Sequence, residues 1–236
     1  MSGERLTAVA VALVIAAGVF AAVAWPANDP ASDQETVPAG AQPLAEPPEP
    51  MLGAPIAWRR SRAVGLPQAG RLVHGVQLPA EGEDFFTWDP IRNTVPNRGW
   101  RRYGTDRLLR VLLDVLRDYR AAHPGAPRVG IGDVSRPGGG DFGPRFGPPG
   151  HASHQNGLDA DVYYPRTDSR ERGPASVAQV DRALAQDLVD RFVRAHARFV
   201  FVGLSVGLHG KRRVVQAIPQ HNNHLHVRLW PRERDG

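Results

Sequence analysis

Three histidines fall within six residues in the segment HNNHLHVRL (residues 221–229), although the whole chain holds only nine. The segment alternates polar and apolar residues as a β-strand does, and side chains on a strand alternate between its two faces. His224 and His226 therefore share one face, about 6.6 Å apart. Either both histidines flank one small object, or one of them binds it and the other works beside it.

On a regular strand, His221 would face the opposite side from His224, because an odd number of positions separates them. Asn222–Asn223 follows it directly, and asparagine pairs favour turns. We expect such a turn to bring His221 back towards the other two imidazoles.

A second cluster, GHASHQNGLDAD (residues 150–161), combines histidines with carboxylates. Asp159 and Asp161 share one face of an expected strand over residues 158–164, by the same alternation. His154 lies in the turn that leads into this strand. A loop and the strand it enters thus present one imidazole and one carboxylate as ligands seven residues apart.

Adding one imidazole from the strand at residues 224–226 completes a set of histidine, aspartate and histidine. Three protein ligands with an open fourth position are what a catalytic zinc site requires. Zinc lowers the pKa of bound water and polarises a carbonyl group, which suits hydrolysis. The helical HExxH arrangement of many zinc peptidases does not occur in the sequence.

Three blocks, GDVSRPGGG, GHASHQNGLDAD and HNNHLHVRL, resemble the signature segments of the penicillin-insensitive murein endopeptidases. This family belongs to a wider group that includes D-alanyl-D-alanine metallopeptidases and lysostaphin-type enzymes. The pattern H-x6-D followed by H-x-H is similar across the group, and the fuller HASHQxGLDxD with HxxHxHVRL is more specific. The resemblance covers about residues 132–229 and leaves the N-terminal part unmatched.

The resemblance implies a role for each matching residue. His154, Asp161 and His226 resemble the zinc ligands, His224 the catalytic histidine beside the metal, His221 a second essential histidine, and His151 an extra ligand or a close neighbour of the metal. It further implies a zinc-dependent endopeptidase that hydrolyses D-alanyl amide bonds in peptidoglycan cross-links.

Peptide hydrolysis also needs a base and a countercharge for the oxyanion. After Glu83 the chain has only Glu171 and Glu233, and neither lies in a motif. His224 is therefore the better candidate for the base, because an imidazole beside a dication favours its neutral form. Arg136 is a candidate for holding a substrate carboxylate through its planar fork of donors.

Other functions use the same features. A D,D-carboxypeptidase or dipeptidase acting on uncross-linked stem peptides would need the same ligands in a different cleft. A non-catalytic, metal-bearing cell-wall-binding module would typically lack a ligand or the catalytic histidine, and every position is filled here. Nucleic-acid binding rests on the net charge of +5 alone, without aromatic residues interleaved with the arginines, so we expect no nucleic-acid partner.

Two features depart from the family pattern. The chain has no cysteine, so the disulfides of known family members must be replaced by packing. The loop over residues 137–150 is rich in glycine and proline, which predicts a substrate cleft of different shape.

The N-terminal segment predicts the compartment. Residues 6–24 contain no charged side chain and follow Arg5, which fits either a membrane anchor or a secretory signal cleaved after Ala24. We expect an exported protein that is periplasmic, associated with the cell wall, or anchored to the outer face of the cytoplasmic membrane. Membrane contact is expected only through this segment, if it is retained.

Composition divides the remaining chain. We expect a signal peptide or anchor over residues 1–25, a proline-rich disordered linker over 26–56 and a metallopeptidase catalytic domain over 57–236. In the domain, apolar periodicity predicts helices over residues 105–122 and 176–197 and strands near 71–79, 128–135 and 158–164. The segments 197–207, 212–218 and 224–230 complete a strand-rich C-terminal half. The expected fold is α+β, a single domain whose central, antiparallel-dominated sheet is flanked by helices.

Overall fold

The computed structural model describes residues 55–147 and 150–232. The expected signal or anchor over residues 1–25, and the linker up to residue 54, lie outside the described residues. Within the described part, no helix combines the length and apolar character that are needed to cross a bilayer.

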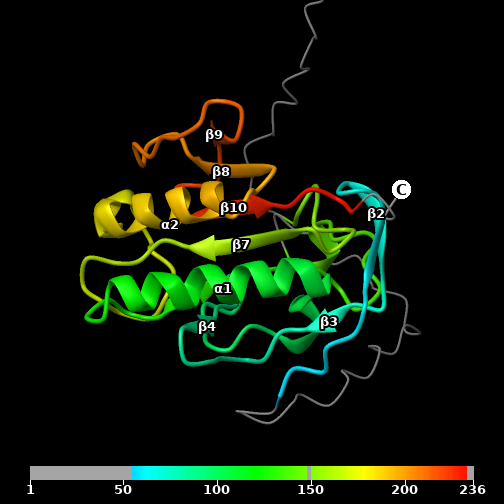
Figure 1. Ribbon diagram of the computed structural model, residues 1–236. Coiled ribbons are helices and arrows are strands. Elements are labelled where there is room, and N and C mark those ends of the chain that lie inside the picture. The colour runs from blue at the N-terminus through cyan, green and yellow to red at the C-terminus, as the bar shows by residue number, and fades with distance from the viewer. Residues whose placement is uncertain (1–54, 148–149, 233–236) are drawn as a thin grey trace, which may run out of the picture. The chain divides into compact units, whose positions relative to one another are not determined.

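A six-stranded sheet forms the centre of the fold (Figure 1). Its strands, in spatial order, are β4 (Phe85–Thr87), β6 (Val129–Ile131), β7 (Asp159–Tyr163), β10 (His224–Arg228), β8 (Phe199–Gly203) and β9 (Val215–Ile218). The three central pairings are antiparallel, and the outer pairs β4–β6 and β8–β9 are parallel. The expected α+β domain with an antiparallel-dominated sheet is confirmed.

Two small antiparallel sheets accompany it: β1 (Arg62–Leu66) pairs with β2 (Ala69–Val73), and β3 (Val76–Gln77) pairs with β5 (Tyr103–Gly104). The single strand expected near residues 71–79 is thus two strands. His74 separates them with a φ of +52°, a left-handed conformation that interrupts an extended chain. Three short 3-10 turns lie at Gly99–Arg101, Pro144–Phe146 and Val177–Gln179.

Helix α1 (Asp106–Ala122) begins where the sequence predicts. The Thr105 side chain accepts a hydrogen bond from the Leu108 backbone amide, which caps one of the free amides of the first turn. The helix ends before Pro124–Gly125. Its buried side is one apolar stripe at helical spacing: Leu108, Leu109, Leu112, Val115, Leu116 and Tyr119.

Helix α2 (Arg182–Arg194) is shorter than expected, because it begins six residues after Ser176. The 3-10 turn at Val177–Gln179 fills part of the difference, and Val180 is extended. Asp181 caps the helix by accepting a hydrogen bond from the Leu184 amide. Two cap-type residues, Ser176 and Asp181, thus precede the helix: the first begins the 3-10 turn and the second begins α2.

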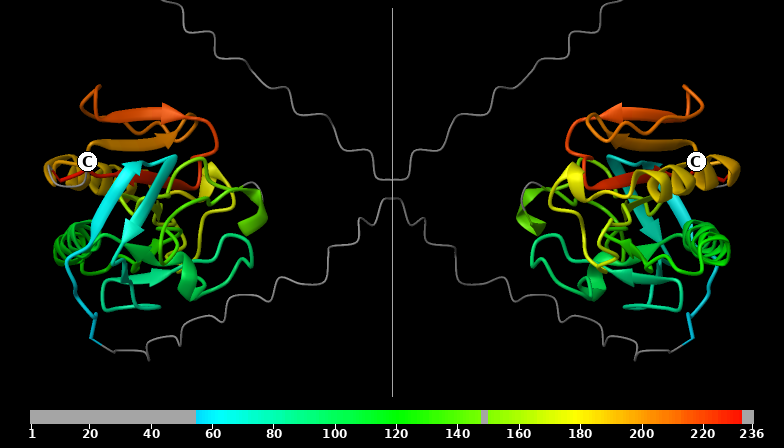
Figure 2. Two further views of the ribbon diagram at one scale, coloured as in Figure 1. Left: turned by 90° about the vertical axis from the view of Figure 1, so that its right-hand side faces the viewer. Right: turned by 90° about the vertical axis from the view of Figure 1, so that its left-hand side faces the viewer.

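Both helices cover the same face of the sheet (Figures 1 and 2). That face carries Ala160 and Val162 of β7 and Leu225 and Val227 of β10, all fully buried in one core with the apolar stripes of α1 and α2. Burial of one such aliphatic side chain contributes about 1.5–3 kcal/mol to folding. Alternation along β7 and β10 therefore leaves their polar residues on the opposite face of the sheet, away from the helices.

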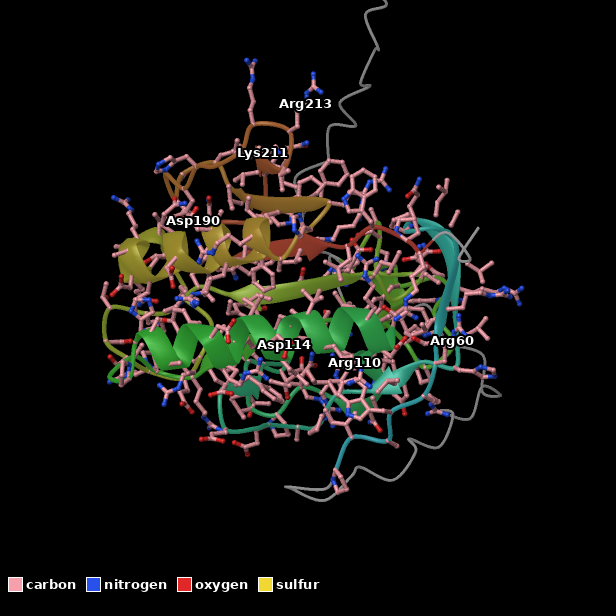
Figure 3. The ribbon with its side chains drawn as sticks, in the orientation of Figure 1. Arg60, Arg110, Asp114, Asp190, Lys211 and Arg213 are labelled. Atoms are coloured by element: carbon pink, nitrogen blue, oxygen red, sulfur yellow. The ribbon has the colours of Figure 1, made fainter. Side chains whose placement is uncertain are left out.

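Charged side chains project outward from the surface elements (Figure 3). Arg110 and Asp114 lie on the exposed side of α1, and Lys211 and Arg213 lie on the connection between β8 and β9. Among the described residues, three arginines are buried instead: Arg101, Arg102 and Arg166.

Candidate active site

The polar face of β7 and β10 brings the two sequence clusters together. Antiparallel pairing places Asp161 opposite His226 and Tyr163 opposite His224. Directly opposed residues on one face of a sheet have neighbouring side chains. The carboxylate of one cluster and the imidazoles of the other thus meet at the centre of the sheet.

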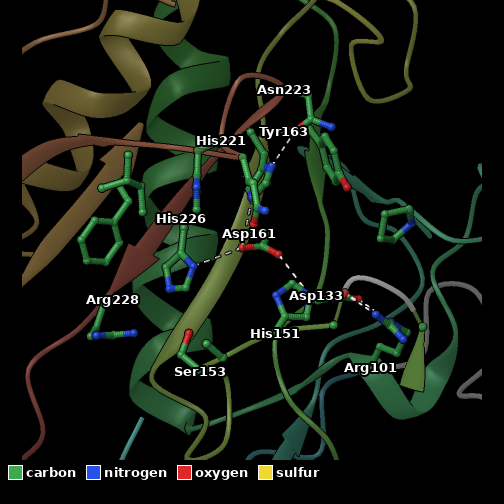
Figure 4. Close-up of a pocket in the computed structure, with 18 of the residues that line it drawn as sticks. Arg101, Asp133, His151, Ser153, Asp161, Tyr163, His221, Asn223, His226 and Arg228 are labelled. Atoms are coloured by element: carbon green, nitrogen blue, oxygen red, sulfur yellow. Dashed lines mark hydrogen bonds and ion pairs between the residues drawn. The ribbon is translucent and has the colours of Figure 1, made fainter. Parts of the chain in front are cut away.

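These residues line a pocket with a volume of about 530 Å³ (Figure 4). The size lies in the range of ordinary ligand sites. The polar lining comprises Gln68, Arg101, Asp133, His151, Ser153, Asp161, Tyr163, Gln220, His221, Asn223, His224, His226 and Arg228. Apolar residues, among them Ile91, Phe201 and Ile218, complete the walls.

His154 is held in one orientation beneath the pocket. Its Nδ1–H donates to the Val134 carbonyl at 2.7 Å, so its Nε2 carries the free lone pair. The backbone of His154 adopts a φ of +67°, a strained conformation for a residue with a Cβ, and the Ser135 hydroxyl donates to its carbonyl. Nε2 lies 3.4 Å from Asp161 Oδ1, and both atoms are buried without a hydrogen-bond partner among the described residues.

Two further imidazole nitrogens face the same oxygen. His226 Nδ1 lies 3.5 Å and His224 Nε2 lies 3.6 Å from Asp161 Oδ1. His226 Nε2–H donates to Asp159 Oδ1 at 2.6 Å, which leaves Nδ1 as the free lone pair. His224 Nδ1–H donates to the Asn223 side chain at 2.7 Å, which leaves its Nε2 free.

Separations of 3.4–3.6 Å are too long for strong hydrogen bonds. They match the spacing of about 3.3 Å between two ligands of one tetrahedral zinc ion with bonds near 2.0–2.1 Å. Asp161 Oδ1 is therefore spaced from these three nitrogens as one metal ligand is spaced from another.

His151 approaches the group from the other side. The ligand atoms of His151, His154 and Asp161 lie within 4.8 Å of one another. His151 Nε2 bonds Asp133 Oδ2 at 2.7 Å and lies 3.8 Å from Asp161 Oδ2. Burial opposes its charge, yet the bond to Asp133 and the charge of Asp161 raise the pKa of His151.

Asp133 is fixed in turn by the buried side chain of Arg101, whose Nε donates to Oδ1 at 2.6 Å. Burial alone would raise the pKa of this carboxyl, but the bonds from Arg101 and His151 lower it. Asn97 Nδ2 also donates to Oδ1, at 3.0 Å. Asp133 is thus an ionised carboxylate that orients His151.

His221 does return to the pocket. Its ring centroid lies 4.8 Å from that of His224 and 5.9 Å from that of His226. Its Nδ1–H donates to the Pro219 carbonyl at 2.6 Å. Gly203 makes this turn possible, because a Cβ there would lie 2.5 Å from the His221 carbonyl oxygen.

Burial favours the neutral form of two pocket imidazoles, His224 and His221, beside an ionised carboxylate. Burial lowers the pKa of His224 to about 4, against the opposing charge of Asp161, and it also lowers the pKa of His221. Burial would raise the pKa of Asp161, but His154, His224 and His151 hold it well below its ordinary value. At neutral pH the carboxylate is charged, and His224 is able to accept a proton.

Arg136 lies away from these residues and is not part of the pocket lining. Its Nη1 donates to the Asp141 carbonyl at 2.8 Å, and its guanidinium stacks on Phe146 at 4.1 Å. The arginines that line the pocket are Arg101 and Arg228.

Arg228 was not predicted as a site residue from the sequence, although its position two residues after His226 places it on the same face of the strand. Asp133 lies in the block GDVSRPGGG but was not predicted as a site residue, and Arg101 carries no comparable signal. Asp133 follows a core strand, and Arg101 lies in a 3-10 turn distant in sequence.

Sequence comparison finds a relative of this chain among known proteins. A protein of Haemophilus influenzae described as a penicillin-insensitive murein endopeptidase is 29% identical over 124 residues, which cover 48% of this chain and 38% of the relative. The chain thus matches well under half of that relative's length.

The model of the penicillin-insensitive murein endopeptidase family matches residues 63–202. This range includes His151, His154 and Asp161, and it ends before the histidines of β10. Because the match spans more than half of the 236 residues, the chain belongs to the penicillin-insensitive murein endopeptidase family.

Proposed function

We propose that this protein is a zinc-dependent murein endopeptidase that hydrolyses D-alanyl amide bonds in peptidoglycan cross-links. The proposal rests on family membership and on one observation: Asp161 Oδ1 lies 3.4–3.6 Å from three imidazole nitrogens. Such a cluster of one anionic oxygen and several nitrogen lone pairs at the base of an open pocket suits a catalytic divalent cation.

The donor set fits a metal on physical grounds. His154 Nε2 and Asp161 Oδ1 are buried, and neither has a hydrogen-bond partner among the described residues. A buried polar atom without a partner costs on the order of 1–3 kcal/mol. A cation between the two atoms would satisfy both at once, and it would offset the repulsion between their lone pairs.

His154, Asp161 and His226 would hold the ion, and His151 would be a fourth ligand if it exchanged its bond with Asp133. Two of these histidines have a partner on the ring nitrogen that faces away from Asp161: Val134 for His154 and Asp159 for His226. Partners of this kind orient metal-binding imidazoles. When bound, zinc supplies Lewis acidity, which polarises a carbonyl group and makes water more acidic.

His224 would act as the general base. It lines the pocket, is neutral at neutral pH, and presents the Nε2 lone pair because its Nδ1–H is bonded to Asn223. Nε2 would take the proton of the attacking water and deliver it to the leaving amine as the carbon–nitrogen bond breaks. His221, 4.8 Å away between ring centroids, would share the positive charge that develops on this pair.

Glutamate, the base of many zinc peptidases, has no place in this pocket as far as the described lining residues show. The imidazole pair therefore takes the role that a carboxylate plays elsewhere. We further propose that residues 6–24 export the protein, so that the pocket meets peptidoglycan outside the cytoplasmic membrane.

Digestion of purified sacculi tests the proposal. The protein should release un-cross-linked muropeptides whose masses correspond to hydrolysis of the cross-link; a chelator should stop the reaction, and added zinc should restore it. Monomeric and cross-linked muropeptides, supplied separately, distinguish an endopeptidase from a carboxypeptidase. Cleavage that persists after verified metal removal would contradict the proposal.

Variants separate the roles of the residues. Asp161→Ala and His226→Ala should lose both bound zinc and activity, whereas His224→Ala should lose activity and keep zinc. His209→Ala is a matched control, because this exposed histidine lies outside the pocket lining. Full turnover by a folded His224→Ala variant would exclude His224 as the base.

A further inference from the structure

Arg228 extends the polar face of β10 beyond the histidines. It lies on the same side of the strand as His224 and His226, opposite Asp159 of β7. Its side chain lines the pocket and is 17% exposed (Figure 4). Two residues along a strand separate it from His226 by about 6.6 Å.

The guanidinium is anchored through one edge only. Nε–H donates to Asp159 Oδ1 at 2.6 Å, and the group lies 5.7 Å from the centroid of the Phe201 ring. Among the described residues, Nη1 and Nη2 have no hydrogen-bond partner. The planar group is thus held at its Nε edge, and the terminal nitrogens of this pocket-lining residue remain available to a ligand.

The other arginine of the lining is not available in this way. Arg101 is 1% exposed, and its donors are bound to Asp133 and to the Phe146 carbonyl. Arg228 is thus the cationic group of the described lining with unused donors. Apolar Phe201 and Ile218 line the same pocket, and limited hydration of this kind strengthens a charge-assisted hydrogen bond.

We propose that Arg228 forms a carboxylate subsite, which selects peptides whose residue next to the scissile bond carries a free carboxylate. The planar fork of arginine binds carboxylates bidentately. The strand spacing between Arg228 and His226 matches the few ångströms that separate a scissile carbonyl from a carboxylate one residue away. This inference rests on the proposed function, since it identifies the substrate of the same pocket.

Paired substrates test it. One is an amino-capped D-alanyl-D-alanine peptide with a free terminal carboxylate, and the other is the same peptide with a terminal carboxamide. Wild-type protein should prefer the acid in kcat/KM by about 10- to 100-fold, the range for a hydrogen bond to a charged group. Arg228→Met should lose this preference, and Arg228→Lys should keep part of it.

The ratio distinguishes binding from a structural role. If Arg228 only held Asp159 in place, Arg228→Met would slow acid and amide equally and leave the preference intact. That result, or a wild-type protein indifferent to amidation, would overturn the proposal. Arg213→Met is the matched control, because this exposed arginine lies outside the pocket. If Arg136→Met lost the preference for the acid and Arg228→Met kept it, Arg136 and not Arg228 would form the carboxylate subsite.

A binding experiment keeps the inference separate from hydrolysis. Titration of both peptides into zinc-loaded His224→Ala protein, by calorimetry, should show tighter binding of the acid. The difference should vanish when Arg228→Met is added to that background. If wild-type protein cleaves neither peptide but the acid still binds more tightly through Arg228, the subsite stands and the proposed reaction fails. Equal affinities would overturn the subsite itself.

Discussion

Asp159→Asn is the substitution that best isolates how the sheet orients a metal ligand. Asp159 is fully buried on β7, where its Oδ1 accepts hydrogen bonds from His226 Nε2 and Arg228 Nε, each at 2.6 Å. Asparagine has nearly the same size and retains an acceptor oxygen, but it carries no charge. The variant therefore tests the charge of this position while the packing changes little.

The magnitude follows from the local electrostatics. Burial alone would raise the pKa of Asp159, but the hydrogen bond from His226 and the charge of Arg228 contribute to lowering it to about 2. A charge-assisted hydrogen bond contributes about 1.5–3 kcal/mol, which corresponds to roughly 10- to 100-fold in affinity. Carboxylates that orient metal-binding histidines contribute about the same factor. We expect the zinc Kd to rise by about 10- to 100-fold.

Competition with a chromogenic chelator measures this Kd directly. The same variant should lose activity at limiting zinc and recover part of it at saturating zinc, because His224 is unchanged but Arg228 loses its charged partner. Asp118→Asn is the matched control: it makes the same chemical change on the exposed side of α1 and should leave the Kd unaltered. Thermal unfolding followed by circular dichroism verifies that both variants are folded.

An unchanged zinc Kd in folded Asp159→Asn would refute the reasoning. It would mean either that His226 does not bind the metal or that its ring is held by packing alone. The ring of His226 does pack edge-on against Phe201, with centroids 5.4 Å apart, so the second explanation has a structural basis. Combining Asp159→Asn with Phe201→Ala would distinguish the two.

Two further predictions concern stability. Thr105→Ala removes the cap of α1 and should lower the free energy of unfolding by about 1 kcal/mol, measured as a shift in the urea midpoint; no shift would show that the cap is dispensable. Hydrogen bonds from Arg128 lower the pKa of Glu171, so this carboxylate stabilises the fold above its unfolded pKa of about 4.3 and less as the pH falls below it. Because the ion pair is partly exposed, Glu171→Gln should lower the free energy of unfolding by less than about 1 kcal/mol at neutral pH, and it should not change it in acid. An equal loss of stability at both pH values would exclude this dependence on the charge of Glu171.

Local signals predicted the elements whose limits are set locally. Helix α1 begins and ends as expected because Thr105, the apolar periodicity and Pro124–Gly125 all agree. The start of α2 could not be predicted, because side-chain contacts outside the helix hold the segment before it. The Gln179 side chain accepts from Arg166 at 2.6 Å and from the Ala175 amide at 2.8 Å, which favours a tight turn there over a helix.

In the site, too, some features could be predicted from local sequence and others depend on residues distant in sequence. Strand alternation alone placed His224 with His226, and Asp159 with Asp161, on shared faces. It could not give the register that sets Asp161 opposite His226, because pairing depends on residues distant in sequence. The ion pair of Asp133 and Arg101 joins residues 32 positions apart, and no local sequence pattern predicts it.

That register explains why the fold and the site depend on each other. Along β10, Leu225 and Val227 enter the core while His224 and His226 enter the pocket, and β7 alternates in the same way. A slip of one residue would move every histidine into the core and every aliphatic side chain into the pocket. The burial of Leu225 and Val227 beneath α1 and α2 therefore selects the one pairing that also gathers the imidazoles around Asp161. Burial of the aliphatic face therefore also holds the polar face in place, although Asp159 Oδ2 and Asp161 Oδ1 on β7 lack hydrogen-bond partners among the described residues.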